Sequence, residues 1–201
     1  MVGVDYFNQE YPYMKKLFLL LSIAVSYSVT AQKHKDSVAI GFMQELAERI
    51  NSIKGKELSE FDACTLDGVR YTSDSLRGKL TVLSFWFEAC MPCVAEVAGL
   101  NQLYADFKGN NHFRFLSFTF DPVAKAKAFV AKNDICYPVI RLEEHQIRKL
   151  NFNAGFPVIA LVNEAGIVVY FRAGGSNSPQ IAKEDLLRDV YPNITKLVKI
   201  N

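Results

Sequence analysis

Two of the four cysteines, Cys90 and Cys93, are separated by only two residues, a spacing that suits disulfide exchange or metal binding. The other candidate metal ligands, Cys64, Cys136, His112 and His145, form no matching second pair, which a zinc site would need. A permanent disulfide is another alternative, but closing so short a loop removes little chain entropy and stabilises a fold only weakly. The spacing therefore predicts a redox-active pair, with no metal and no cofactor beyond the cysteines themselves.

The elements expected around the pair support this interpretation. A near-continuous run of apolar, β-branched and aromatic residues over 80–87 predicts a strand buried on both faces. Apolar residues at helical spacing predict a helix over 91–107, with Pro92 in its first turn, where a missing N–H costs little. The Cys90 sulfur would then lie beside unpaired N–H groups and the positive end of the helix dipole, which favour a thiolate. We expect Cys90 to attack a substrate disulfide and Cys93, one turn along, to resolve the mixed disulfide.

The rest of the chain predicts alternating strands and helices. Its first part is expected to form a helix over 36–53, a hairpin from strands 61–66 and 69–72, and a helical turn at 73–77. After the helix at 91–107 we expect strands over 113–120, 137–142, 157–163 and 167–172, helices over 122–132, 143–150 and 179–190, and a short or polar tail. This order predicts an α/β fold with a central mixed sheet flanked by helices, an N-terminal β-hairpin and a helical N-terminal extension.

The composition is that of a globular protein. The chain has 201 residues and 50% of them are hydrophobic, enough for one domain with extensions. Its formal net charge is only +2 and its basic residues are scattered, so we expect no nucleic-acid partner. Four cysteines are too few for a disulfide scaffold in a chain of this length. We expect Cys64 and Cys136 to pack in the core, with a second disulfide as the alternative.

The N-terminal residues have the layout of a secretory signal peptide. A lysine pair precedes an uncharged apolar run over residues 17–29, and small residues follow up to Ala31. This run is shorter than the roughly 20 residues that span a bilayer, so cleavage is favoured over a membrane anchor. Acidic residues before Met14 do not fit a basic n-region, and we expect translation to start at Met14. The predicted divisions are a signal peptide over 1–31, a helical extension over 32–57 and a domain over 58–201, in a periplasmic or otherwise extracytoplasmic protein.

Several short motifs together resemble the exported TlpA/ResA-like branch of the thioredoxins. They are Asp67-Gly68, Gly78-Lys79, Phe85-Trp86, Cys90-x-Pro92-Cys93 with Glu96, Phe120-Asp121 and Gly155-Phe156-Pro157, within about residues 58–190. The resemblance implies a thioredoxin-like fold in which Cys90 is the solvent-facing nucleophile and Cys93 the buried resolving thiol. It also implies that Pro157 is the family's cis-proline, which faces the dithiol.

The resemblance implies further site residues. Glu96 matches a glutamate that handles protons near the dithiol, and an ordinary exposed helix residue is an equal alternative for it. The position of the buried acid in cytoplasmic thioredoxins is Ser84 here, which leaves Glu96 as the natural substitute. The backbone of Phe156 is expected to pair with an extended substrate segment. The expected substrate-binding residues are Met91, Pro92, Phe156, Pro157 and Trp86.

These residues predict an enzyme that reduces protein disulfides outside the cytoplasm, with electrons from a membrane-bound redox partner. The same residues would also serve a disulfide oxidase or isomerase. A copper chaperone that binds Cu(I) through both cysteines is a further alternative, since soft thiolates favour this ion. Its family has three residues between the cysteines, however, where this chain has two. A peroxidase ranks last because the Pro-x-x-x-Thr/Ser-x-x-Cys motif is absent.

Overall fold

The computed structural model describes residues 40–41 and 44–198. The predicted helix over 36–53 is confirmed at its described positions, which are helical up to residue 53. The predicted signal peptide over 1–31 lies outside the described residues.

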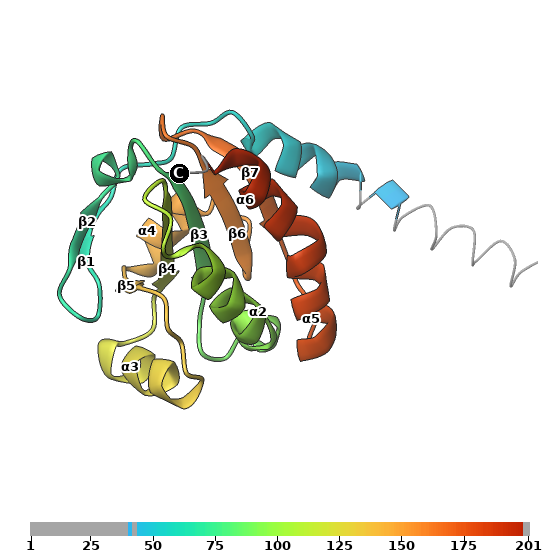
Figure 1. Ribbon diagram of the computed structural model, residues 1–201. Helices are drawn as coiled ribbons and strands as arrows, with labels where there is room; N and C mark the ends of the chain where they lie inside the picture. Colours follow the sequence, from blue (N-terminus) through green and yellow to red (C-terminus); the bar gives the residue numbers. More distant parts are fainter. Residues whose placement is uncertain (1–39, 42–43, 199–201) are drawn as a thin grey trace, which may run out of the picture. The chain divides into compact units, whose positions relative to one another are not determined.

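The chain divides into two compact units, residues 1–48 and residues 49–201. The second unit contains every strand that the structure describes, in the predicted order (Figure 1). Its strands are β1 (Asp62–Cys64), β2 (Arg70–Thr72), β3 (Leu80–Trp86), β4 (Phe113–Thr119), β5 (Val139–Arg141), β6 (Val158–Val162) and β7 (Val168–Ala173). Its helical elements after β2 are the 3-10 helix η1 (Asp74–Leu76), α2 (Met91–Phe107), α3 (Val123–Lys132), α4 (Glu144–Leu150), α5 (Pro179–Asp185), the π-helix η2 (Leu186–Val190) and α6 (Tyr191–Leu197).

Strand β3 occupies the centre of a five-stranded sheet with the order β5-β4-β3-β6-β7. It pairs parallel with β4 and antiparallel with β6, while β5 runs parallel to β4 and β7 antiparallel to β6. Strands β1 and β2 form a separate antiparallel hairpin. The predicted mixed sheet and N-terminal hairpin are therefore confirmed.

Two hydrophobic clusters cover the two faces of the sheet, because successive side chains of a strand point to opposite sides. Val82 and Trp86 of β3 belong to the cluster that also contains residues of α2, α3, η2 and α6. Leu83 and Phe85 belong to the second cluster, together with residues of α4 and of the segment 53–61. All seven residues of β3 are buried as a result. The strand that leads to Cys90 is thus buried on both faces, as its composition predicted.

The predicted short or polar tail after residue 190 is wrong. The chain passes from η2 directly into α6, and Val190, Ile194 and Val198 are all buried. These apolar residues recur every four positions, which is the spacing of one helix face. Pro192 does not interrupt the helix because it lies in the first turn of α6.

The expected burial of Cys64 and Cys136 is also wrong, because both are exposed free thiols. Cys64 ends β1, which belongs to the small hairpin and not to the five-stranded sheet. Cys136 lies in the loop before β5, where its amide donates a hydrogen bond to the Asn101 side chain at 3.1 Å. A second disulfide between them is not present in this structure.

Candidate active site

Cys90 and Cys93 form a disulfide at the start of α2, and their Cα atoms are 5.2 Å apart. Cys90 is the N-cap residue of this helix, and its sulfur accepts a hydrogen bond from the Cys93 amide with an N···S distance of 3.3 Å. Pro92 lies in the first turn, as predicted. A helix start stabilises negative charge on the Cys90 sulfur, because its free N–H groups and the helix dipole point towards it.

The loop between β3 and α2 is held by Asp121, which follows β4 in the chain. The Asp121 carboxylate accepts hydrogen bonds from the Glu88 amide at 2.7 Å and from the Thr119 hydroxyl at 2.9 Å. The Cys90 amide donates to the Phe87 carbonyl at 3.0 Å and closes the turn. The central strand and its parallel neighbour therefore fix the position of Cys90 together.

The two cysteines differ little in exposure. In this disulfide form Cys90 is 6% exposed and Cys93 is 4% exposed, so the expected solvent-facing position of Cys90 is corrected to a nearly buried one. Met91, between them, is 66% exposed. The Met91 side chain is therefore an exposed surface residue between the two nearly buried cysteines.

Pro157 lies next to the cysteine pair. The Phe156–Pro157 peptide bond is cis, and Pro157 lines one small enclosed cavity together with Cys93 and Glu96. The Pro157 carbonyl accepts a hydrogen bond from the Gly174 amide at 2.9 Å. The structure thus brings together residues from α2 and from the start of β6 that lie far apart in the sequence.

Phe156 is half-buried, and its ring packs edge-on against two other aromatic rings. The ring centroids lie 5.2 Å from Phe87 and 5.5 Å from Phe120. These three aromatic residues follow β3, follow β4 and precede β6, so they gather at the edge of the sheet where Cys90 lies.

Glu96 is almost completely buried, at 1% exposure, so the alternative of an ordinary exposed helix residue is wrong. Its carboxylate accepts a hydrogen bond from the Arg172 guanidinium at 2.8 Å. Burial raises the pKa of the Glu96 carboxyl to about 7, although attraction and hydrogen bonding to Arg172 act in the opposite direction. Ser84 lines the same cavity as Glu96 and Cys93. A buried carboxyl group whose pKa is raised to about 7 therefore lines the same cavity as Cys93.

The model of the AhpC/TSA family matches residues 54–171, which is more than half of the chain and includes the cysteine pair and Pro157. The chain belongs to this family. Its relatives include thiol-disulfide oxidoreductase ResA of Bacillus thuringiensis subsp. konkukian, which is 27% identical over 139 residues, covering 69% of this chain and 79% of the relative. ResA of Halalkalibacterium halodurans is 25% identical over 165 residues, covering 78% of this chain and 89% of the relative. These relatives confirm the predicted enzyme class, a thiol–disulfide oxidoreductase.

A solved structure confirms the predicted thioredoxin-like fold of this AhpC/TSA family member. The thioredoxin domain of a thiol-disulfide oxidoreductase from Bacteroides vulgatus superimposes with a TM-score of 0.59 at 21% identity. The superposition covers 73% of this chain and 98% of that domain.

Trp86 does not lie on the surface of this family member, so its expected place among the substrate-binding residues is corrected. It is buried, stacks on Phe129 at 4.7 Å between ring centroids and donates its indole N–H to the Ser117 hydroxyl at 3.3 Å. Trp86 packs in the same cluster as Cys90 and Cys93, so we expect its fluorescence to change when the pair is reduced.

Arg172 and Gly175 also lie at this site, although they were not predicted as site residues from the sequence. Arg172 was included only as the end of a predicted strand, and both residues lie beyond the segment that the family model matches. An arginine next to buried positions of a strand was the available signal, because a charged side chain there needs a partner.

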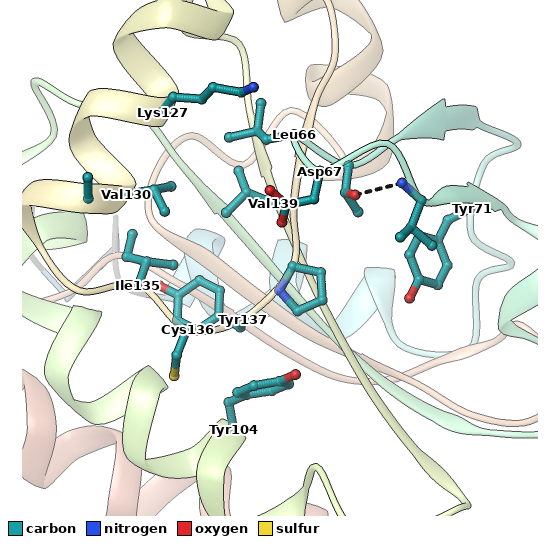
Figure 2. Close-up of a pocket in the computed structure, with 14 residues that line it drawn as sticks. Leu66, Asp67, Tyr71, Tyr104, Lys127, Val130, Ile135, Cys136, Tyr137 and Val139 are labelled. Carbon is teal, nitrogen blue, oxygen red and sulfur yellow. Dashed lines mark hydrogen bonds between the residues drawn. The ribbon is translucent and has the colours of Figure 1, made fainter.

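A larger cavity of about 460 Å³ is lined by residues of the β1–β2 hairpin, α2, α3 and the loop before β5 (Figure 2). Tyr104, Lys127, Cys136 and Tyr137 are among its lining residues, and none of these belongs to the first turns of α2. Tyr104 follows Cys90 by 14 residues, which corresponds to about 21 Å along a helix. Tyr137 lines both this cavity and the small cavity beside Cys93 and Glu96, so the two cavities share this residue as a wall.

Within residues 40–41 and 44–198, no group of three His, Cys, Asp or Glu side chains is placed to hold a metal ion. In the same part of the chain, no helix has the length and apolar character needed to cross a membrane.

Proposed function

We propose that this protein is an exported enzyme that reduces protein disulfides, with Cys90 as the nucleophile. The observation that carries the proposal is the Cys90–Cys93 pair at the first turn of α2, beside Pro157 and the buried Glu96. A pair in this position exchanges easily between dithiol and disulfide, because the helix start stabilises the thiolate that attacks and leaves.

The reaction begins with the reduced pair. The Cys90 thiolate attacks one sulfur of a substrate disulfide, which forms a mixed disulfide and releases the first substrate thiolate. Cys93 then transfers its proton to the Glu96 carboxylate and attacks the Cys90 sulfur. This step releases the second substrate thiolate, which takes up a proton, and leaves the Cys90–Cys93 disulfide. Two electrons pass from the enzyme to the substrate, and a membrane-bound dithiol partner returns them.

Substrate recognition is proposed at the edge of the sheet that carries the pair. The backbone of Phe156 pairs with an extended segment of the substrate protein, as strand addition does in other peptide complexes. Met91, Pro92, Phe156 and Pro157 contact the residues that flank the substrate disulfide. The high exposure of Met91 supports this assignment, because an exposed methionine adapts to different partners.

The location outside the cytoplasm rests on the sequence up to Ala31: we propose that translation starts at Met14 and that the residues from there to Ala31 are a cleaved signal peptide. The remaining chain then consists of an extension over 32–57 and the thioredoxin-like domain over 58–201. Exported proteins have no glutathione or thioredoxin pool around them, so a working dithiol needs a dedicated electron donor.

The reduction potential of the pair tests the direction of electron flow. Mature protein is equilibrated in thiol/disulfide buffers while the fluorescence of Trp86, the single tryptophan, is followed. A potential near or below about −250 mV is expected, because reductants of this fold lie in that range. A variant with Cys64→Ser and Cys136→Ser is the control, since it removes the two exposed free thiols. A potential near about −120 mV would contradict the proposal, because it is that of a strong disulfide donor.

A further inference from the structure

The Glu96–Arg172 ion pair joins α2 to β7, and it is almost entirely enclosed. The Arg172 Nη1 atom lies 2.8 Å from Glu96 Oε1, and the exposed fractions of the two side chains are 15% and 1%. The residues are 76 positions apart in the chain. In the sheet, Arg172 is paired in register with Ile159 of β6, two residues after Pro157. The guanidinium therefore approaches the active site from the β6–β7 edge.

A buried ion pair contributes little net stability to a fold. Burying two charges costs several kcal/mol in desolvation, and apolar residues of similar volume often stabilise a core as well or better. A buried ion pair whose carboxylate lines a cavity together with a cysteine is more typical of a site that controls a proton. The position of the pair therefore points to the chemistry of Cys93.

Several groups act on the Glu96 carboxyl from the elements around it. Arg172 of β7 favours the charged carboxylate, whereas Asp185 of α5 disfavours it. The hydroxyl groups of Tyr137 and Tyr170 are within electrostatic reach of Glu96, and burial keeps both of them protonated. The Cys93 sulfur lines the same cavity. Of these groups Arg172 carries the positive charge that opposes the effect of burial on Glu96.

Because Gly175 has no side chain, the Glu96 carboxyl can occupy the space next to it. A Cβ atom at this position would be 2.9 Å from Glu96 Oε1 and 3.1 Å from Pro157 Cγ, which is closer than side chains tolerate without moving. The preceding Gly174 has a φ of 84° and donates its amide to the Pro157 carbonyl. The turn after β7 thus lies against both Pro157 and Glu96.

We propose that Arg172 is a positioning residue that holds the Glu96 carboxyl against the Cys93 side of the cavity, and that Gly175 is required because any side chain there would displace this carboxyl. The inference rests on the proposed function, in which Glu96 accepts the Cys93 proton. Without Arg172 the carboxylate loses the charge that stabilises it, and a higher pH is needed before it can accept a proton.

The test measures the two exchange steps separately across pH 5–9 with a disulfide-bonded model peptide. In Arg172→Gln, the midpoint, which is the pH at which the resolving step reaches half of its maximal rate, is expected to rise by about one unit. This change slows the step about fivefold at pH 7. Arg172→Lys, which keeps the charge, is expected to restore most of the wild-type profile. The matched control is Arg148→Gln, because Arg148 forms an exposed ion pair on α4.

Formation of the mixed disulfide is measured in a Cys93→Ser background. The Arg172→Gln change is expected to leave this first step unaltered, which shows that the variant is folded and that Cys90 still reacts. A midpoint that does not move in Arg172→Gln would overturn the inference while leaving the proposed function intact. Absence of the first step in protein with Arg172 present would instead overturn the proposed function.

Gly175→Ala provides an independent check. Displacement of the carboxyl is expected to slow the resolving step at least about fivefold at pH 7, again with the first step unaltered. The matched control is Gly109→Ala, because a Cβ at position 109 would meet no atom within 4 Å. A resolving step of wild-type rate in Gly175→Ala would contradict the part of the proposal that concerns Gly175.

Discussion

Replacement of either cysteine of the pair by serine is expected to abolish turnover with a protein disulfide, a loss of at least about a thousandfold. Residues that act as one catalytic unit are each indispensable, so the single changes Cys90→Ser and Cys93→Ser should cost as much as the double change. A serine hydroxyl at position 90 is a poor nucleophile at neutral pH. A serine at position 93 cannot release the enzyme from its mixed disulfide.

The chain supplies a matched control for this experiment. Cys64 and Cys136 are free and exposed, so Cys64→Ser and Cys136→Ser test whether any accessible thiol contributes. Both variants are expected to keep wild-type turnover in a steady-state assay of peptide disulfide reduction. Substantial residual turnover in Cys90→Ser, or a large loss in Cys136→Ser, would contradict the assignment of the pair as the sole reactive site.

The change Glu96→Gln is expected to slow the resolving step about a hundredfold at pH 8, because positioned acid–base groups contribute by roughly this factor or more. In the wild-type protein this step should accelerate as the pH rises through about 7, where the Glu96 carboxyl loses its proton. The variant should lack that midpoint. Rapid-mixing measurements of peptide thiol release between pH 5 and 9 give both results.

Glu60→Gln is the control for the loss of one negative charge, since Glu60 is exposed. It is expected to retain both the rate and the midpoint. A Glu96→Gln protein with the wild-type midpoint would show that another group accepts the proton of Cys93.

The Glu96 carboxyl also makes the stability of the fold depend on pH. The pKa of Glu96 is about 7 in the fold and near 4.5 as its ordinary value, so the folded state binds the proton more tightly. Its contribution is fully present below pH 4.5 and is lost as the pH rises to 7, by about 3 kcal/mol in the free energy of unfolding. In the pH dependence measured by urea unfolding, the difference between wild type and Glu96→Gln isolates this effect from those of other groups.

Local sequence patterns were sufficient to predict the elements that carry the cysteine pair. The apolar run of β3 and the helical periodicity of α2 each lie within one segment, and the Cys90–Cys93 spacing lies at their junction. The burial of Glu96 could not be predicted in this way. It depends on Arg172, 76 residues further along the chain, and on the turn that contains Gly175.

The wrong predictions for Cys64, Cys136 and Trp86 also arise from contacts between residues that are distant in the sequence. Cys64 and Cys136 were expected in the core because cysteine is often buried, but a short separate hairpin and a loop carry them. Trp86 was placed near the substrate because it precedes the cysteine pair, but the alternation of β3 points it into the cluster beneath α2 and α3. Which face of a strand becomes covered is decided by elements distant in sequence.

The most direct test of the central claim is to trap the mixed disulfide. Reduced Cys93→Ser protein is mixed with a disulfide-bonded peptide, and its intact mass and peptide map are recorded. We expect one covalently attached half of the peptide, joined to Cys90 and released by reductant. An adduct joined to Cys64 or Cys136, or no adduct at all, would contradict the assignment of Cys90 as the nucleophile.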